Sequence, residues 1–462
     1  MLKARKRIML IGWDFDARIE LIRGEDARDA GEAPVTIGDL IYWLVERTPA
    51  LEVYLLRWDL GALHSLFRGK TIFTVAKWAM HPRIHVKLDH HHPPAASHHQ
   101  KIVVIDDTFA FCGGIDMTAD RWDTRAHADD DPDRKAPGGA ASDPWHDASS
   151  ALQGPAAAAL GKHARDRWKR ASGETLTGIR AKHDCWPDDL PVQFSDVAVT
   201  IARTAPEMDD QRPVHEIEQL YLAQISRAQR WIYAESQYFA SRRVAEALAR
   251  RLDETDGPEV VIINPLTAEG WLEPIAMDSA RARLVEALRR RDKYGRLRLY
   301  HPHTRDRQPI YVHAKIMIID DAIIRVGSSN LNNRSMRLDT ECDIAIDCAD
   351  NADRHGDCAE AIAAIRNGLI AEHLAVDVES VAAMIADTGS IVQTIESLRF
   401  DGRKNARDRR ATLIPYEVPD LSSVEAWLAD NEVLDPEGPG EMFEAFDERG
   451  LFRQLSLWRK SL

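Results

Sequence analysis

The sequence predicts an α/β protein made of two similar halves, each an α/β/α sandwich, which pack together as a pseudo-dimer and are followed by a mostly helical C-terminal appendix. Two observations predict this fold class. One short phrase occurs twice, at residues 99–106 and 313–320, and short β-branched runs alternate with longer amphipathic segments around each copy. Such alternation is typical of a largely buried sheet that helices cover.

The pattern of apolar residues gives the individual elements. Runs of β-branched and aromatic residues predict strands at residues 7–12, 52–56, 83–87, 101–105, 197–203, 231–234, 259–263, 296–300 and 315–319. Helical periodicity predicts helices at residues 37–48, 154–171, 213–228, 242–254, 277–291 and 357–373. We therefore expect a first half at residues 1–190, a second half at 191–352 and a helical extension at 353–462, with residues 180–195 linking the halves.

The two halves differ at their start. A helix of about four turns is expected before Trp231 in the second half, whereas almost nothing precedes Arg7 in the first. Either the start of the chain is truncated, or another segment covers that face of the first sheet.

The repeated phrase is the main functional signal. Residues 99–106 read His-Gln-Lys-Ile-Val-Val-Ile-Asp and residues 313–320 read His-Ala-Lys-Ile-Met-Ile-Ile-Asp, so both fit His-x-Lys-x4-Asp. A glycine-rich segment begins 14 residues after each histidine, at Gly113 and at Gly327. A core requires only apolar residues of suitable size, so a histidine, a lysine and an aspartate kept at fixed spacing indicate chemistry.

The residue types in the phrase suit phosphodiester chemistry. Alternate side chains of a strand share a face, so His99 and Lys101 point the same way, as do His313 and Lys315. Two such strands facing each other bring two imidazoles and two ammonium groups into one cleft. One imidazole attacks phosphorus, the other protonates the leaving oxygen, and the lysines neutralise developing charge. This chemistry needs no metal and no cofactor.

Composition excludes some classes of protein. The chain has 462 residues and a formal net charge of −14, which disfavours a nucleic-acid binder that relies on neutralising phosphates. Five scattered cysteines without a CxxC pair suggest a reducing compartment. The basic start is followed by only four apolar residues, too few for a signal peptide. No apolar run approaches the ~20 residues that span a bilayer. We expect a cytoplasmic protein, with peripheral contact to the membrane left open.

The chain resembles the phospholipase D superfamily, whose members carry this phrase twice, and the likeness covers most of residues 5–350. Several blocks resemble its lipid-acting branch: Gly12-Trp13-Asp14-Phe15-Asp16, Ser97-His98-His99-Gln100-Lys101, Gly113-Gly114-Ile115-Asp116, Arg121-Trp122-Asp123-Thr124, Pro144-Trp145-His146-Asp147 and Glu235-Ser236-Gln237-Tyr238-Phe239. The resemblance implies that His99 is the nucleophile and forms a phosphohistidine, that His313 is the general acid, and that no metal takes part. It implies a glycerophospholipid substrate, at a membrane surface or in micelles, and no nucleic-acid partner; the oligomeric state is open, with a monomer favoured.

Further polar residues complete the expected site. A nucleophilic imidazole needs a carboxylate on its other nitrogen to fix the tautomer. Candidates follow the glycine-rich segments: Asp123 in the first half, and Asp339 or Glu341 in the second. The motif aspartates Asp106 and Asp320 fall at turns and are expected to brace the site. Residues expected to bind or orient substrate are Asp116, Ser328 and Asn330.

Other features leave alternatives open. The loop at residues 126–149 is either a functional lid or a solvated acidic loop. This loop and residues 270–272 are expected to form the walls that decide whether water or an alcohol accepts the transferred group. Adjacent histidines suit no single tetrahedral metal site, which disfavours a metal at residues 90–99. Four tryptophans belong either to a substrate pocket or to the core: Trp13, Trp122, Trp145 and Trp271.

Three alternatives to a lipid-cleaving enzyme would rest on the same two motifs. A cardiolipin-synthase-like phosphatidyltransferase would use the same site with a lipid alcohol as acceptor. A nuclease or phosphodiesterase acting on nucleic acid is disfavoured by the acidic balance. A non-catalytic anion-binding scaffold is disfavoured by two complete motifs.

Overall fold

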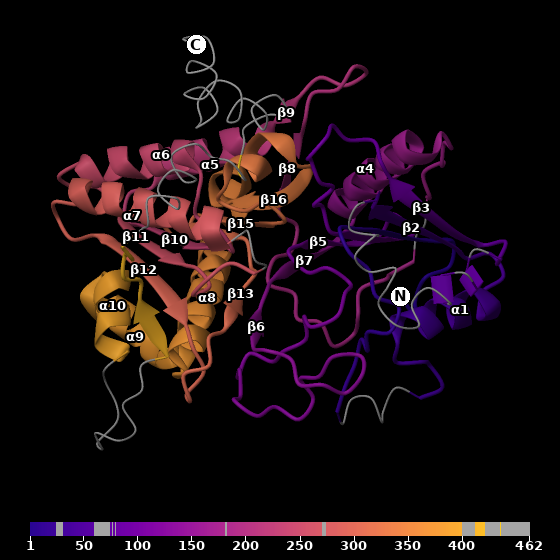
Figure 1. The fold of residues 1–462 in the computed structure, drawn as a ribbon, viewed down its shortest axis with the longest axis horizontal. Coiled ribbons are helices and arrows are strands. Elements are labelled where there is room, and N and C mark those ends of the chain that lie inside the picture. The colour runs from indigo at the N-terminus through magenta and orange to yellow at the C-terminus, as the bar shows by residue number, and fades with distance from the viewer. Residues whose placement is uncertain are drawn as a thin grey trace, which may run out of the picture.

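Two sheets lie side by side, each with helices on both faces (Figure 1). The computed structural model describes residues 1–24, 31–59, 74–75, 77–78, 80–180, 183–269, 274–399, 412–420 and 435. The predicted fold class is confirmed: residues 7–153 build the first sheet and residues 200–415 build the second. The expected segment at residues 270–272, with Trp271, lies outside the described residues.

The first sheet has six strands in the order β3-β2-β1-β4-β5-β7. Strands β1, β2 and β3 are parallel, and β4, β5 and β7 continue the sheet with antiparallel pairings. The bounds are β1 Arg7–Gly12, β2 Glu52–Trp58, β3 Ile84–Asp89, β4 Ile102–Ile105, β5 Phe109–Gly113 and β7 Ser149–Gln153, with helices α1 Ile37–Arg47 and α4 Pro155–Ser172. Every residue of β1 is buried, as a central strand between two helical layers requires.

The second sheet has nine strands in the order β17-β12-β11-β10-β14-β15-β16-β8-β9. The strands are β8 Thr200–Ala205, β9 Val214–His215, β10 Trp231–Glu235, β11 Glu259–Ile263, β12 Leu297–Pro302, β14 Ile316–Ile319, β15 Ile323–Gly327, β16 Glu341–Asp347 and β17 Leu413–Pro415. The α-helices are α5 Glu216–Arg227, α6 Arg242–Asp253, α7 Ser279–Arg291, α8 His355–Leu374, α9 Val378–Thr388 and α10 Ile391–Leu398; short π or 3-10 segments occupy Pro274–Asp278, Arg334–Leu338 and Cys348–Arg354.

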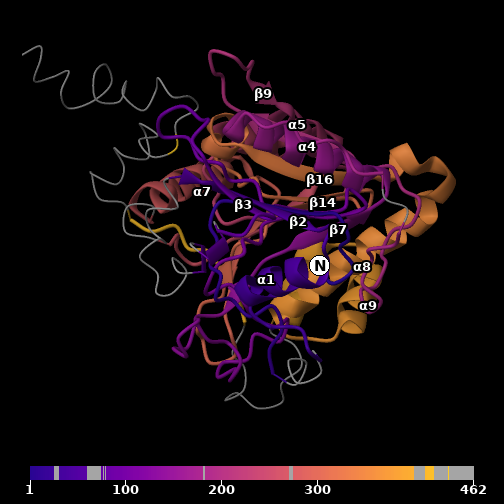
Figure 2. The same ribbon diagram turned by 90° about the vertical axis from the view of Figure 1, so that its right-hand side faces the viewer.

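The helices form the outer layers of both halves (Figures 1 and 2). In the first half α1 packs on one face of the sheet and α4 on the other. In the second half α5, α6 and α7 share one apolar core, and α8, α9 and α10 share the core on the opposite face. The segment after residue 353 therefore supplies one helical layer of the second half, and its β17 adds an edge strand to β12.

The linker covers the face that lacks a leading helix. In the second half α5 packs over β8, β14 and β16. No α-helix precedes β1 in the described part of the first half. There, Cys185 and Trp186 pack into the core beneath α1, and the Trp186 ring meets Phe109 edge-on with centroids 5.5 Å apart. Part of the linker therefore covers this face, as one of the two expected explanations has it.

Internal pairings show that the halves are built alike. Phe15 bridges Met117 in the first half, and Phe239 bridges Leu331 in the second. Strand β1 pairs β4 as β10 pairs β14, with Ile8 opposite Ile105 and Ile232 opposite Ile319.

The motif aspartates close two equivalent turns. Asp106 and Asp107 have φ of 51° and 55°, and Asp320 and Asp321 have φ of 52° and 56°. Two central residues at positive φ form the tight turn that suits a two-residue hairpin. Asp106 accepts hydrogen bonds from the backbone N–H groups of Arg5, Lys6 and Arg7, at 2.6 to 2.8 Å. Asp320 does the same for residues 229–231, which lead into β10. Each aspartate ties the end of the motif strand to the start of its neighbour.

The halves meet through paired backbone as well as side chains. Strand β6, Trp145–His146, pairs in parallel with β13, Tyr311–Val312. Thr340 donates to the carbonyl of Ser97 at 2.9 Å and accepts from the N–H of His99 at 3.0 Å. This pairing explains why β4 begins only at Ile102: the expected strand starts one residue earlier, but the chain before it pairs with the opposite half.

The loop expected at residues 126–149 is held by its own contacts and ends in strand. Arg134 is 3% exposed and donates to the carbonyls of Ala128, Asp129 and Ser142 and to the carboxylate of Asp123. Residues 145–146 form β6, and Ser149 starts β7. Within the described ranges, none of the helices combines the length and apolar character that crossing a membrane requires.

We expect Asp320→Asn to lower the free energy of unfolding by about 2 kcal/mol, because hydrogen bonds to a charged acceptor are among the stronger ones. Asparagine tolerates positive φ, so the turn is kept while the charge is lost. Denaturant unfolding measures the change. Asp209→Asn, in an exposed loop, is the matched control. Equal stability of the two variants would contradict the bracing role.

Candidate active site

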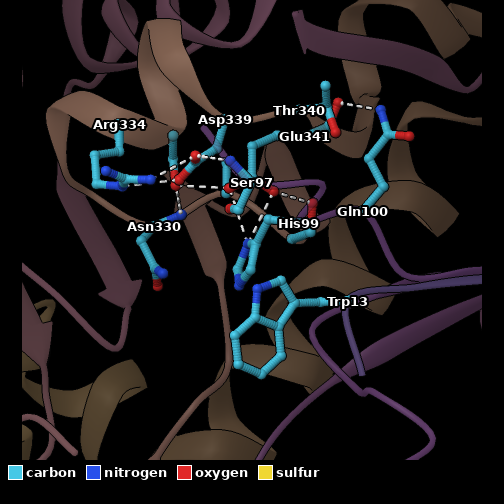
Figure 3. Close-up of polar contacts among 12 residues, drawn as sticks. Trp13, Ser97, His99, Gln100, Asn330, Arg334, Asp339, Thr340 and Glu341 are labelled. Carbon is cyan, nitrogen blue, oxygen red and sulfur yellow. Dashed lines mark hydrogen bonds and ion pairs between the residues drawn. The ribbon is translucent and has the colours of Figure 1, made fainter. Parts of the chain in front are cut away.

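Each motif histidine contacts a carboxylate of the opposite half. His99, just before β4, places Nδ1 2.9 Å from Oε1 of Glu341, the first residue of β16 (Figure 3). Glu341 is fully buried and also accepts hydrogen bonds from the hydroxyls of Ser328 and Ser335. A carboxylate fixed by two hydroxyls orients the imidazole and leaves Nε2 free to face the cleft.

The second motif histidine, in the second half, contacts a carboxylate of the first half in the same way. His313 Nδ1 lies 2.7 Å from Oδ2 of Asp147. The backbone N–H of His313 donates to the carbonyl of His146 at 2.7 Å. Gly114 makes this approach possible, because a Cβ there would lie 2.2 Å from Oδ1 of Asp147. The site therefore exists only where both halves meet.

Asp147 is the residue that the sequence analysis missed. It belongs to a block that resembled the lipid-acting branch, but it lies 34 residues after Gly113, whereas Glu341 lies 14 residues after Gly327. The longer loop of the first half hides the equivalence. Pairing of Gly113 with Ser149 and of Gly327 with Asp343 restores it, because Asp147 and Glu341 each precede the paired residue by two.

The expected orienting role of Asp123 is wrong. Its carboxylate contacts His127 Nδ1 at 2.9 Å, Arg134, and the backbone N–H of Trp145 at 2.9 Å, so it holds the loop. Asp339 accepts from the N–H of Ser97 at 2.7 Å and pairs with Arg334, which positions the chain before His99. Of the three candidates, Glu341 is the one that contacts a motif histidine.

Burial and the two lysines keep both imidazoles neutral. Burial lowers the pKa of His99 well below its usual value, and the charges of Lys101 and Lys315 act in the same direction. Burial likewise lowers the pKa of His313, with Lys315 and Arg121 adding to the effect. Burial raises the pKa of Asp147 to about 6, which leaves it ionised at neutral pH. The charges of both lysines act on both histidines, as expected for four groups that lie near one another at the seam between the halves.

The lysines have different partners. Lys101 donates to the carbonyl of His99 at 2.7 Å and pairs with Asp116 at 3.1 Å. Lys315 donates to the carbonyl of His313 and lies 3.4 Å from the amide oxygen of Gln237. Asn330, which occupies the position equivalent to Asp116, also contacts Gln237, at 3.3 Å. Burial lowers the pKa of Lys315 to about 7.

Aromatic rings wall the cleft. Trp145 stacks on Tyr311 with centroids 4.8 Å apart, and its ring centroid lies 5.2 Å from that of His313. Arg121 lies over the Trp145 ring at 3.8 Å. Trp13 stacks on Trp58 at 5.7 Å and is drawn with the His99 group in Figure 3. Trp122 lies apart from these rings, under Arg23 at 5.2 Å.

A buried network of histidines and glutamates backs the second histidine. His146 is held between two carboxylates, with Nε2 2.6 Å from Glu235 and Nδ1 2.9 Å from Glu372. His373 contacts Glu235 at 2.9 Å, and His127 contacts Glu372 at 3.2 Å. These groups are close enough to hold a metal ion. However, their N···O distances are those of hydrogen bonds, and carboxylates on both nitrogens of one ring indicate a doubly protonated imidazole.

The charge of His146 makes stability depend on pH. Burial alone would lower the pKa of His146, but Glu235 and Glu372 outweigh it and raise the pKa to about 10. The unfolded value is near 6.5. The native state therefore binds the extra proton between pH 6.5 and 10, so this contribution is complete below pH 6.5 and is lost as pH rises through 10.

We expect the stability difference between the natural protein and His146→Gln to shrink by at least about 1.4 kcal/mol between pH 6.5 and 10, the equivalent of one pKa unit. Denaturant unfolding across this range measures it. His355→Gln, at an exposed position on α8, is the control and should show a constant difference. A constant difference for His146→Gln as well would contradict a protonated His146.

The chain matches models and members of one protein family. A family model described as "Phospholipase D" matches residues 1–246, and one described as "Cardiolipin synthase, PLD-like domain" matches residues 221–360. Phospholipase D alpha 4 of Arabidopsis thaliana is 23% identical, with 75% of this chain and 59% of that protein covered. Phospholipase D alpha 1 of Carica papaya is 24% identical, with 74% and 58% covered. The chain thus spans about three fifths of the length of these relatives.

One solved structure is similar along most of the chain. Phosphatidylserine synthase of Haemophilus influenzae Rd KW20 is 14% identical, with 86% of this chain and 90% of that chain covered and a TM-score of 0.46. The family assignment rests on the family models, the first of which matches more than half of the sequence. The chain belongs to the phospholipase D superfamily, a family of phosphodiesterase-type enzymes.

Proposed function

We propose that this protein is a phospholipase D, which cleaves the distal phosphodiester bond of glycerophospholipids and transfers the phosphatidyl group to water or to an alcohol. The observation that carries the proposal is the exchanged pair of contacts, His99 with Glu341 and His313 with Asp147, around two buried lysines. This arrangement supplies a nucleophile, an acid and positive charge in one cleft.

In the first step Nε2 of His99 attacks phosphorus. The neutral imidazole that burial and the lysines maintain has the free electron pair that attack needs. Glu341 contacts Nδ1 and holds the imidazole in place; burial raises the pKa of this carboxyl well above its usual value, so positive charge on the ring favours the ionised form of Glu341. Lys101 and Lys315 neutralise the non-bridging phosphate oxygens, where negative charge increases. The bond between phosphorus and the head-group oxygen breaks, and a phosphohistidine remains.

His313 provides the proton for the leaving oxygen. Its pKa is low in the empty cleft, because burial and Lys315 disfavour the charged ring. A bound phosphodiester anion acts in the opposite direction and raises that pKa, so substrate binding itself favours the protonated form of His313. In the second step His313 takes a proton from water or an alcohol, which attacks phosphorus and releases neutral His99.

The lipid substrate is supported by sequence likeness. The plant relatives are named phospholipases D, and the blocks around Trp13, Asp116, Trp145 and Gln237 resemble the lipid-acting branch. The identity of 23–24% and the partial coverage leave the head group unassigned.

A second candidate is a phosphatidyltransferase of the cardiolipin-synthase kind. The match of residues 221–360 to a model of that description favours it. Both candidates share the phosphohistidine and differ in the acceptor, so the products distinguish them. Mixed phospholipids with ethanol should give phosphatidylethanol and phosphatidic acid for the first candidate. Phosphatidylglycerol as acceptor should give cardiolipin for the second.

We expect His99→Asn to lower phospholipid turnover by more than ~10⁴-fold, as loss of a covalent nucleophile does. His313→Asn should slow release more than attack when the substrate carries a good leaving group, so that labelled phosphatidyl accumulates on His99. Mass spectrometry of the trapped protein locates the label. His355→Asn is the matched control with normal turnover. Label on His313 and never on His99 would reverse the two roles.

We expect Trp145→Ala to raise the share of hydrolysis over transfer to ethanol, because it removes the ring beside His313 that excludes water. Trp145→Phe keeps an aromatic wall and is the matched control. The ratio of phosphatidic acid to phosphatidylethanol measures the effect over a range of ethanol concentrations. If both variants keep the natural ratio, this wall does not select the acceptor.

A further inference from the structure

A pocket with many basic side chains lies at the start of the first half, away from the motif histidines His99 and His313. It has a volume of about 460 Å³ and forms where the chain before and within β1 meets Ile179, Arg180 and His183. Five basic side chains line it: Arg5, Lys6, Arg7, Arg180 and His183. One carboxylate, Glu52, is also in the lining and accepts a hydrogen bond from the Tyr54 hydroxyl at 2.9 Å.

Of these basic groups, His183 pairs with Asp106 at 3.0 Å, whereas the others have no acidic partner among the described residues. In the described ranges, Arg5, Lys6 and Arg180 are exposed and have no ion-pair partner. Arg7 is 9% exposed; one of its terminal nitrogens donates to the carbonyl of Thr177 at 2.7 Å, and its Nε has no hydrogen-bond partner. A buried guanidinium with an unused donor is costly unless a ligand or water satisfies it. This concentration of positive charge stands out in a chain of net charge −14.

The fold separates this pocket from the phosphodiester cleft. Arg7 and Gly12 are the two ends of β1, roughly 17 Å apart at about 3.3 Å per residue. At the Gly12 end the neighbouring Trp13 donates to Asp116, the partner of Lys101. At the Arg7 end Asp106 binds the backbone N–H groups of Arg5, Lys6 and Arg7, the residues that line the pocket. A ligand here is not the lipid bond that is cleaved.

We propose that this pocket binds an anion through a phosphate group. Arginine offers paired donors that match phosphate oxygens, and several arginines with a lysine around one cavity are typical of phosphate recognition. The volume falls within the range of about 300–1,000 Å³ for small-molecule pockets. The phosphate belongs either to a free phosphate ester or to a lipid head group, and the same contacts serve both.

An anion bound in this pocket stabilises the first half near Asp106. The residues whose side chains bind the anion are those whose backbone holds Asp106 at the end of the motif strand. A ligand that binds only the folded state raises the unfolding temperature, and the effect grows with the logarithm of its concentration above Kd. The response weakens with salt, because the contacts are charged.

The test compares Arg5→Gln/Arg180→Gln with the natural protein and with Arg250→Gln, an exposed control on α6. Calorimetry with inorganic phosphate, against chloride at equal ionic strength, measures binding. Phosphate can also enter the histidine cleft, so the relevant quantity is the binding that the double variant loses. We expect that component to weaken at least ~10-fold in the double variant and to persist in the control.

Sedimentation with phosphatidylcholine vesicles, with and without phosphatidic acid, separates the two sources; every protein in this arm also carries His99→Asn, so that turnover does not change the vesicles. Extra binding to the anionic vesicles that the double variant loses assigns the pocket to a lipid head group. Phosphate binding without such vesicle binding assigns it to a free phosphate ester. Phosphate and vesicle binding that are equal in the double variant and the natural protein would overturn the proposal, as would the absence of both. Circular dichroism shows whether the double variant is folded.

Discussion

The candidate active site depends on one constraint: the carboxylate that contacts each motif histidine comes from the opposite half. His99 is oriented by Glu341 and His313 by Asp147, so neither half holds a histidine in working geometry by itself. The surrounding structure serves this exchange. Backbone pairing between Ser97 and Thr340, and between β6 and β13, fixes the distance across the seam. The site is therefore a property of the assembled pair and not of either sandwich.

The regular part of the fold was predictable because its signals are local. Strands Arg7–Gly12 and Glu259–Ile263 have the expected bounds, since buried parallel strands appear as continuous apolar runs. The expected turns at Asp106 and Asp320 follow from two short polar residues between apolar strands, and the structure adds what the spacing could not, the three backbone N–H groups that each carboxylate binds.

The unpredicted features require contacts between distant parts of the chain. Asp147 occupies the position in the fold that is equivalent to Glu341. Its distance along the sequence from the glycine-rich segment differs, because the first half carries a longer loop. Asp123 has the expected charge and place in sequence, yet His127 and Arg134 hold it in that loop. Trp186 takes the place of a helix over Phe109, and a single ring in a linker carries no helical periodicity. Strands β6 and β13 are two residues long, too short for a pattern.

The proposed mechanism gives the two histidines different tasks although the halves are built alike. The structure breaks the symmetry at the partner of each lysine: Asp116 meets Lys101 with a full charge, while Asn330 and Gln237 offer amides on the side of Lys315. Burial lowers the pKa of Lys315 to about 7 even though Asp147 and Glu341 act in the opposite direction, so an incoming anion has a large effect on this side. The pKa of His313 is lowered chiefly by burial and then by Lys315. Phosphate that neutralises Lys315 therefore removes part of the repulsion against a proton on His313, for which Lys315 is the largest of the charged causes. For His99 the largest charged cause is Lys101, which Asp116 already pairs, so the same phosphate changes His99 less, as the proposed division into acid and nucleophile requires.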